Sequence, residues 1–380
     1  MNHVRLAFFN CFGFISIGCI VSQLIPLLNK DFSSMQKSFI LGLGALTSFL
    51  LAVLLGKMSD SIKKIKPSVF VSMFVYLLFI SFIFIDISRL LKGISFIIVI
   101  AMSRMLMSTI ETFILSKKKE TFAKYHCMGA IGLIIGSLSS SFLDDIQKVM
   151  FCFFSGFVCI LLVLPIKEEK KETKSIQLKD MIVLLKNKTY LRILSLIFFL
   201  MMMGFADQFV VIDKMLSLGA SSTLITIKYA IQASMEIPLY LLVNRILKRF
   251  NYLSLLLICI FMSAIKLGLY ALVKTPYMIV LVSLLQIVTH PLIVILSKKM
   301  ISVVTPSHLL ASSQIIGFAF YFGMSGFLAA FISQWLNQQY SFNITLYTFS
   351  LLSILPFIIW CFMRKYDKVK VVIENENILN

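Results

Sequence analysis

Six ionisable residues lie inside long apolar stretches of the sequence, where a charge is unusual. They are three cations and three carboxylates: Arg104, Glu111, Asp207, Lys228, Glu236 and Lys266. An ionisable side chain at the depth of a lipid bilayer is costly unless it is paired or faces a polar cavity. These residues therefore indicate ion pairing, proton transfer or the binding of a polar solute, and their formal charges sum to zero, as pairing requires.

The spacing of these residues predicts which of them share a helix face. Arg104 and Glu111 are seven residues apart, which is two helical turns, so both can point into one cavity. Lys228, Gln232 and Glu236 follow one another at intervals of four residues and form a slanted polar stripe. A helix that faces lipid could not carry this stripe, and we expect the stripe to line a path through the protein.

A further polar group precedes a proline. Ser283, Gln286 and His290 recur at spacings of three and four residues. Pro291 follows directly, and proline removes a backbone hydrogen bond and permits a bend. A bend beside polar side chains suits a gate.

Several of these residues also have a structural interpretation. Arg104 with Glu111 could be a buried structural pair or contact other helices, and Asp207 could lock neighbouring helices together. His290 could be a packed, hydrogen-bonded histidine that does not titrate. The sequence leaves these alternatives open.

The composition places these residues in a membrane protein. Of the 380 residues, 59% are hydrophobic and only 14% are charged, which lies far outside the usage of soluble domains. A formal net charge of +19 could suggest nucleic acid, but the basic residues lie in short clusters between apolar runs and carry no recognition motif. The histidines lack metal-ligand spacing, and there is no nucleotide-binding or esterase motif. We therefore expect no enzyme activity, no metal, no cofactor and no nucleic-acid partner.

Twelve apolar runs approach the roughly 20 residues that a helix needs to cross a bilayer. They cover residues 6–28, 39–56, 67–85, 93–115, 127–142, 149–166, 193–212, 224–243, 253–273, 277–296, 309–335 and 344–362. The fifth run is short, and its Gly129, Gly132 and Gly136 predict a face for close helix packing. The predicted fold class is an all-α integral membrane protein with twelve transmembrane helices.

Basic residues distinguish the two sides of the predicted bundle, because Lys and Arg accumulate in cytoplasmic connections. With the N-terminus inside, every second connection and both termini carry most of them, including Lys298 and Lys299 after the tenth run. The opposite side carries only Lys30, Lys37, Arg89, Lys92, Lys148, Lys214 and Lys274. We expect both termini in the cytoplasm. A residue usage rich in Lys, Ile, Phe and Asn favours a bacterial source, and hence the inner membrane.

The longest polar stretch, residues 167–188, mixes Glu with Lys in the manner of a solvated linker. It divides the chain into an N-terminal six-helix bundle (1–166), a cytoplasmic linker (167–190), a C-terminal six-helix bundle (191–365) and a cytoplasmic tail (366–380). Within the linker, residues 176–185 have apolar residues at helical spacing and could lie along the membrane surface.

Two groups of six helices joined by a charged loop resemble the major facilitator superfamily. The connection after the second run reads Gly56-Lys-Met-Ser-Asp60-Ser-Ile-Lys63-Lys64. It is similar to the superfamily signature of a glycine, an acid four residues on and then basic residues, although the glycine after the acid is missing. The resemblance implies a gating loop at Gly56, Asp60 and Lys64, and two halves that surround a midplane site.

Within the superfamily, the chain is most similar to the branch of lactose permease and other oligosaccharide/proton symporters. Glu111-Thr-Phe-Ile, a basic loop and then Tyr125-His126 resemble that branch's junction between the fourth and fifth helices. The pair Asp207-Gln208 resembles its Asp-Gln pair in the seventh helix. The segment 286–291 is similar to its tenth helix, and by this matching Lys266 occupies the position of a functional arginine.

The departures from that branch bear on the solute. Glu111 matches a carboxylate that recognises sugar hydroxyls, but its partner arginine is here His126 and the stacking tryptophan is Leu133. The proton-coupling His and Glu of the branch fall at Gln286 and Thr289. A galactoside is therefore not expected, and the protonated residue lies elsewhere.

These observations predict a secondary active transporter that works by alternating access. We expect proton-coupled uptake of a sugar, a nucleoside or a similar polar solute, energised by the proton gradient, in a monomer embedded in the lipid bilayer. The predicted solute-binding residues are Arg104, Glu111, His126, Gln232, Gln286 and His290. The predicted proton-coupling residues are Glu236, with Glu111 as second choice, and Lys266, Lys228 and Asp207. Burial favours the neutral acid, whereas an approaching cation favours the carboxylate.

Two other functions fit parts of the sequence. Arg104 resembles the arginine of many drug antiporters, and the 35 phenylalanines could line a greasy pocket for proton-driven efflux of amphipathic compounds. The glycine that follows the arginine in the antiporter motif is absent. A non-transporting receptor or sensor is the alternative of another class, but no signalling domain is recognisable in the sequence.

Overall fold

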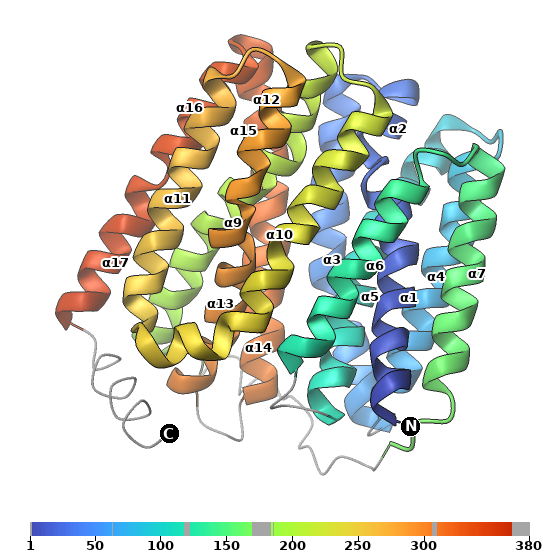
Figure 1. The fold of residues 1–380 in the computed structure, drawn as a ribbon, viewed down its shortest axis with the longest axis horizontal. Helices are drawn as coiled ribbons and strands as arrows, with labels where there is room; N and C mark the ends of the chain where they lie inside the picture. Colours follow the sequence, from blue (N-terminus) through green and yellow to red (C-terminus); the bar gives the residue numbers. More distant parts are fainter. Residues whose placement is uncertain are drawn as a thin grey trace.

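The computed structural model consists of helices that stand side by side (Figure 1). It describes residues 2–62, 64–117, 122–168, 184, 186–305 and 310–366, and none of these residues forms a strand. Ten helical segments in the described ranges are long and apolar enough to cross a membrane. The predicted class, an all-α integral membrane protein, is confirmed.

Seven helices lie within the described residues of the first half of the chain. They are α1 (Asn2–Val21), α2 (Leu24–Asp31), α3 (Ser34–Ile62), α4 (Lys66–Phe84), α5 (Arg89–Lys117), α6 (Phe122–Ser139) and α7 (Asp145–Val163). α1 packs against α6 and α7, whereas α5 packs against α3 and α4. The two groups meet where α1 touches α5 and where α4 touches α7.

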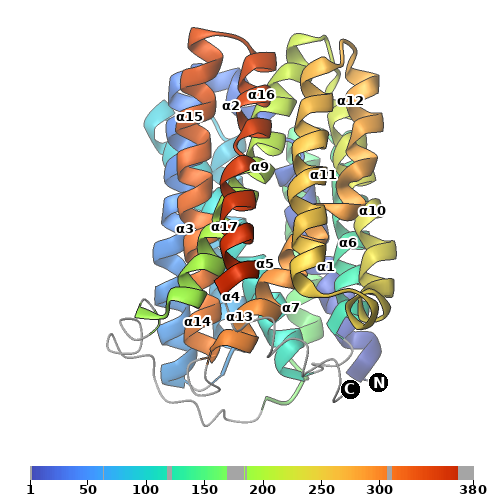
Figure 2. The ribbon, with the colours of Figure 1, turned by 90° about the vertical axis from the view of Figure 1, so that its left-hand side faces the viewer.

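The second half begins at α9 (Lys188–Ser217), inside the predicted linker. It continues with α10 (Ser222–Arg249), α11 (Tyr252–Leu272), α12 (Pro276–Val282), η1 (Ser283–Val288), α13 (His290–Val304), α14 (Leu310–Phe318), η3 (Ala319–Met324), α15 (Ser325–Gln339), α16 (Phe342–Leu351) and α17 (Ile354–Tyr366). α9 packs against α15 and α17, and α11 packs against α16. Figure 2 shows α11, α15, α16 and α17 in front of the helices of the first half.

Ten of the twelve predicted spans are confirmed by length and composition. The other two, 127–142 and 224–243, form α6 and α10, which are helical and pack against each other but are more polar. In α10 the polar residues include the stripe of Lys228, Gln232 and Glu236. α1 begins and α17 ends toward the same end of the bundle, as an even number of spans requires (Figure 1).

The polarity of this bundle is inverted relative to a soluble protein. Its outer faces carry large exposed apolar side chains, such as Phe74, Phe154 and Leu241. Its interior holds buried charges, such as Asp207 and Lys228. Exposed apolar surface of this extent requires an apolar environment, so the fold is that of a protein embedded in lipid.

Proline breaks the tenth predicted span as expected. The segment starts as α12, tightens into the 3₁₀ turn η1 and resumes as α13, with Pro291 in the first turn of α13. Thr289 joins the two parts with φ −114° and ψ −98°, outside the helical region. Because Pro291 has no N–H, it cannot continue the helical hydrogen bonding, and the helix is interrupted beside Gln286 and His290.

Short polar residues cap the N-termini of α10, which carries the polar stripe, and of α11, which carries Lys266. The Ser221 hydroxyl caps α10 by accepting from the backbone N–H of Leu224. The Asn251 side chain caps α11 in the same way. Between α9 and α10 the chain reverses at Gly219, whose φ of +80° favours a residue without a Cβ. The two caps and the turn at Gly219 fix the C-terminal end of α9 and the N-terminal ends of α10 and α11. They thereby set how deep in the bundle the charged residues of these helices lie.

The glycine face predicted in the fifth run is confirmed. A Cβ atom on Gly132 would collide with the carbonyl oxygen of Cys11, and one on Gly136 would collide with that of Ile15. Both carbonyls belong to α1, so α6 and α1 approach more closely than side chains would allow. The face holds the first half together and leaves the rest of α6 to meet α10.

The two halves of the chain meet along two seams. α6 packs against α10 on one side, and α3 packs against α15 and η3 on the other. The division into two bundles with its boundaries stays a prediction, because most of the linker (169–183 and 185) and the tail from 367 lie outside the described residues. The amphipathic segment 176–185 also lies almost wholly outside them.

Candidate functional site

A cavity of about 250 Å³ lies between the two seams and is lined by both halves of the chain. The first half contributes side chains from α1, α5 and α6, and the second half contributes side chains from α9, α10, α11, η1, α13 and η3. All six predicted solute-binding residues line it: Arg104, Glu111, His126, Gln232, Gln286 and His290. Three of the four predicted proton-coupling residues also line it, namely Asp207, Glu236 and Lys266.

Asp207 is the centre of a buried network inside the second half. Its Oδ1 lies 2.8 Å from the Lys228 Nζ, and its Oδ2 lies 2.6 Å from the Lys266 Nζ. The Gln232 amide donates to Oδ2 at 2.8 Å. The carboxylate therefore has two cations in contact, which is the geometry of a fixed ion pair.

Lys228 does not line the cavity, contrary to the expectation for the polar stripe of α10. Its side chain is 0% exposed and lies behind Asp207, while Gln232 and Glu236 face the open space. The reason is the partner on α9, since a buried ammonium is stable only where a carboxylate meets it. The stripe is thus split between a buried ion pair and a lining surface.

Glu236 differs from Asp207 because no cation of the described residues touches it. Its carboxylate accepts a hydrogen bond from the Gln286 amide at 3.4 Å and one from the Tyr240 hydroxyl at 3.3 Å. Lys266, the predicted partner cation, donates instead to the Gln286 Oε1 at 2.5 Å. Gln286 therefore stands between the cation and Glu236, and the expected direct contact with Lys266 or Lys228 is not present.

Glu111 connects the two halves of the chain. Its Oε2 lies 2.6 Å from the Nζ of Lys298 on α13, and its Oε1 lies 3.5 Å from the Nδ1 of His126 on α6. The prediction that Lys298 belongs to a cytoplasmic connection is wrong, because α13 continues to Val304 and places Lys298 on the cavity lining. His126 extends the contact by packing its ring edge-on against Tyr240 of α10, with centroids 4.4 Å apart.

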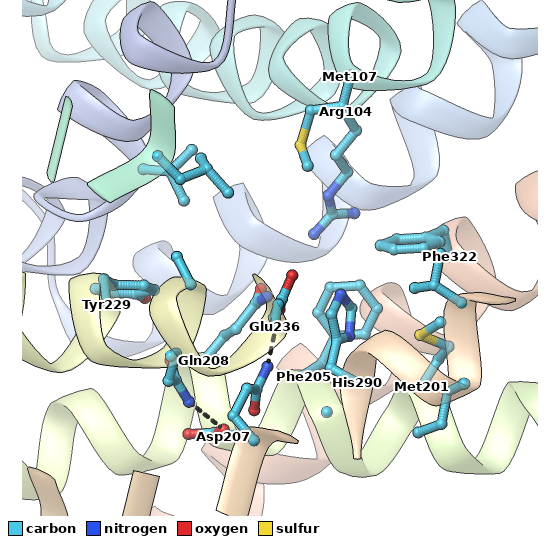
Figure 3. A pocket seen from close by; sticks show the side chains of 18 of the residues that line it. Arg104, Met107, Met201, Phe205, Asp207, Gln208, Tyr229, Glu236, His290 and Phe322 are labelled. Atoms are coloured by element: carbon cyan, nitrogen blue, oxygen red, sulfur yellow. Dashed lines mark hydrogen bonds between the residues drawn. The ribbon is translucent and has the colours of Figure 1, made fainter. Parts of the chain in front are cut away.

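Arg104 points into the cavity without an ion pair. Its guanidinium lies 4.7 Å from the centroid of the Phe205 ring, and Figure 3 shows it directed from α5 toward Phe205 and His290. Among the described residues its Nη1 is buried and has no hydrogen-bond partner. A buried pair between Arg104 and Glu111 is not formed, since Glu111 pairs with Lys298, and the alternative that these residues contact other helices holds for Glu111.

A second pair between the halves lies at the opposite end of the bundle from Lys298. The Lys37 Nζ on α3 lies 2.7 Å from the Asp213 carboxylate on α9, and it also donates to Asn29 at 2.8 Å. The distribution of basic residues places Lys37 on the outer side for its charge alone, and no sequence pattern singles out Asp213. The only signal was an acid directly after the seventh apolar run.

The aromatic part of the lining was also missed. Phe205 packs against Phe322, and Phe322 stacks on Phe318, with centroids 5.8 Å and 4.7 Å apart. All three line the cavity together with Met107 and Met201 (Figure 3). Phenylalanine is so common in this chain that no sequence pattern distinguishes those at the site from those that face lipid.

The predicted gating loop is mostly helical. Gly56 and Asp60 belong to the last turns of α3, and the side chain of Asp60 is not among those that the structure describes. Lys64 follows the helix, and its carbonyl accepts a hydrogen bond from the Ser59 hydroxyl at 3.0 Å. Beyond it, the Glu168 carboxylate accepts from the backbone N–H of Ile65 at 2.6 Å. The role of this segment as a gate stays a prediction.

Nothing in the described part of the chain is arranged as a metal centre. No group of three His, Cys, Asp or Glu side chains in these ranges could hold an ion. The cavity instead combines fixed charges, amides, one histidine from each half and aromatic rings. This combination suits a small molecule with polar and apolar parts.

Comparisons with known proteins identify a related family and related folds. The family model described as MFS_1 like family matches residues 3–349. A solved structure of the nucleoside transporter NupG is similar with a TM-score of 0.76 and 16% sequence identity, over 96% of this chain and 100% of that chain. The structure of a NupG mutant gives a TM-score of 0.77 and 15% identity over the same shares. No curated protein matches this chain.

Proposed function

The chain belongs to the MFS_1 like family, so it is a multi-pass membrane transporter of solutes and not an enzyme, and on that premise we propose proton-coupled uptake by alternating access. One observation carries the proposal: a single cavity between the halves is lined by charged side chains from both of them. A solute held there contacts both halves at once. Its binding can therefore be coupled to their relative movement.

The ion pairs at the two ends of the bundle support alternating access. Glu111 with Lys298 joins the halves toward the end where α1 begins, and Lys37 with Asp213 joins them at the other end. Opening the cavity to one side requires the pair on that side to break. The two side chains of each pair are in direct contact, and they can stay in contact only while the halves are closed on that side.

Glu236 is the proposed proton carrier. It faces the cavity, its hydrogen-bond donors among the described residues are the neutral Gln286 and Tyr240, and it is linked to Lys266 through Gln286. A solute that displaces the Gln286 amide changes the surroundings of the carboxylate directly. Asp207 is a poor carrier by comparison, because a proton there would leave two buried lysines without their counter-charge.

The proposed solutes are small and polar, with nucleosides and sugars as the first classes to test. The likeness to NupG, which is described as a nucleoside transporter, puts nucleosides at the head of the panel. At 16% identity this likeness concerns the fold. The cavity itself adds amide and histidine groups that can bond hydroxyl or base edges.

The test is solute-driven proton movement in liposomes that contain the purified protein and an internal pH dye. Acidification on addition of one solute class, with none in empty liposomes, is the expected result. Silence across nucleosides, sugars and small organic acids, together with no uptake of labelled solute, contradicts the proposal.

Glu236→Gln tests the assignment of the proton carrier. We expect the variant to bind solute and to exchange it down a gradient while uphill uptake and proton movement fall at least tenfold. Asp145→Asn is the matched control, because this exposed carboxylate lies on the surface and its ion pair in the described part of the chain is with Lys148. Intact proton-driven uptake in Glu236→Gln contradicts the role given to Glu236.

Proton-driven efflux of amphipathic compounds is the second candidate, and the aromatic lining favours it. Phe205, Phe318 and Phe322 give one wall of the cavity an apolar surface. Growth of an expressing strain in a panel of toxic cations separates the two functions. Uptake predicts no protection, whereas efflux predicts protection that depends on the proton gradient.

The remaining assignments follow from the charge distribution. We expect the protein in the inner membrane of a bacterium, as a monomer, with both termini cytoplasmic. Protease accessibility of tags at each terminus in sealed, oriented vesicles tests the orientation.

A further inference from the structure

The charges around the cavity balance except at one residue. In the second half, both ammonium groups contact one carboxylate, because Lys228 and Lys266 pair with Asp207. Glu236 is joined to Lys266 only through Gln286, and when Glu236 is ionised the two carboxylates balance the two lysines. Glu111 and Lys298 balance each other across the halves. Arg104 remains, and in the described part of the chain no carboxylate pairs with it.

The surroundings of Arg104 do not supply a replacement for a counter-charge. Its Nη1 is buried and lacks a hydrogen-bond partner among the described residues. The nearest stabilising contact is the face of the Phe205 ring at 4.7 Å, and a ring supplies less than a carboxylate. A guanidinium without a counter-charge is costly inside a protein unless another group binds it there.

The geometry of a guanidinium determines which chemical group can bind it. Its N–H donors lie in one plane and match the two oxygens of a carboxylate or phosphate, which it binds in bidentate fashion. Phe205, Phe322 and Met201 line the cavity on the side toward which Arg104 points (Figure 3). They therefore offer an apolar surface to the remainder of a bound solute. The volume of about 250 Å³ is just below the range of roughly 300–1,000 Å³ for ligand pockets, which limits the solute to a small one.

We infer that the transported solute carries an oxyanion, a carboxylate or a phosphate, and that Arg104 binds this group while the body of the solute lies against Phe205 and Phe322. The oxyanion completes the charge balance of the cavity. This inference rests on the proposed transport function and narrows its substrate class from polar solutes in general to acidic ones.

The experiment uses matched solutes that differ only in the acidic group. The pairs are nucleosides with their 5′-monophosphates, hexoses with their 6-phosphates and with uronic acids, and aromatic carboxylates with their amides. Binding is measured as the rise in unfolding temperature of the purified protein, and transport as uptake of labelled solute into liposomes. The acidic member of at least one pair is expected to bind and to be taken up, and its neutral partner is not. The phosphate and carboxylate series show which oxyanion is preferred.

Three variants connect this preference to Arg104. Arg104→Gln is expected to weaken binding of the acidic solute by about 30-fold or more, and Arg104→Lys by about tenfold, since it keeps the charge but loses the planar fork. Arg89→Gln is the matched control on the same helix, because Arg89 is exposed and donates to Gln36 at the far end of α5. It should bind like the parent protein.

The unfolding temperature without solute distinguishes a binding role from a structural one. Because Arg104 has no ion pair in the structure, Arg104→Gln should unfold at the same temperature as the parent protein or higher. A large drop in that temperature, or equal uptake of neutral and acidic members with Arg104→Gln unchanged, overturns the inference and leaves the transport function standing. If no member of any pair binds or is taken up, both proposals fail.

Discussion

Two sets of buried charges in this protein differ in where their partners lie. Asp207, Lys228 and Lys266 stand on α9, α10 and α11, which all belong to the second half. The pairs Glu111–Lys298 and Lys37–Asp213 each join one half to the other. Movement between the halves leaves the first set intact and must break a pair of the second. A buried charge therefore marks a moving part only when its partner lies across the interface.

Burial separates the Glu111–Lys298 pair from the Asp207 network. The Asp207 network is almost completely enclosed, with Lys228 at 0% exposure. Lys298 and Glu111 keep 29% and 15% of their side chains exposed, whereas Lys37 and Asp213, at 5% and 12%, are nearly as enclosed as Lys266 and Asp207, at 6% and 8%. Removing one partner of an enclosed pair costs about 3–5 kcal/mol, whereas a partly solvated pair is worth about 1 kcal/mol or less. Weak pairs suit positions that must open and close in every cycle.

The largest effect is expected for Asp207→Asn. The change leaves two buried lysines without their carboxylate, so the free energy of unfolding should fall by about 3–5 kcal/mol. Thermal unfolding of the purified protein in detergent, together with the yield of folded protein, measures it. Asp213→Asn is the matched control, since it is the same change on the same helix, at a pair that crosses the halves. Equal losses in the two variants contradict the distinction drawn between the two sets.

The sequence predicted most of the polar residues that line the cavity, but it did not predict which of them are in contact with one another. Spacing along a helix determines a shared face, and this placed Arg104 and Glu111 on one lining. It cannot tell which helix lies opposite, so Glu111 was considered with Arg104 and not with Lys298. The rule that basic residues accumulate on the cytoplasmic side placed Lys298 in a connection for the same reason. It counts a lysine near a helix end as a topology signal whether or not a carboxylate lies opposite it.

Gly136→Ala tests a rigid contact inside the first half. A Cβ at this position collides with the backbone carbonyl of Ile15, which cannot move aside as a side chain would. We expect the free energy of unfolding to fall by about 1–3 kcal/mol. Gly204→Ala on α9 is the control, because nothing lies within 4 Å of the added methyl group. If Gly136→Ala is as stable as Gly204→Ala, α1 and α6 are not held in close contact.

Glu111→Gln and Lys298→Gln should affect transport more than stability. Each removes a pair between the halves, so uphill uptake should fall about tenfold while the free energy of unfolding changes by about 1 kcal/mol or less. The charge swap Glu111→Lys with Lys298→Glu should restore part of the activity if the pair itself matters. Uptake in proteoliposomes and thermal unfolding are measured on the same preparations. A swap no better than either single change indicates that Glu111 acts on the solute instead.

Lys37→Met is expected to have the smallest effect on uptake, and its direction matters more than its size. Loss of the contact with Asp213 weakens closure at that end by about 1 kcal/mol or more, a shift of about fivefold or more in the population open to that side. Polar maleimide labelling reports the shift in a background with Cys361→Ser, which removes the exposed native thiol. Ser22→Cys lines the cavity toward the Lys37 end, and Ser108→Cys lines it near Glu111. Lys37→Met should speed labelling at position 22, and Glu111→Gln should speed it at position 108. If both variants speed labelling at the same position, the two pairs do not close opposite sides of one cavity, because a loosened pair can raise access only on its own side.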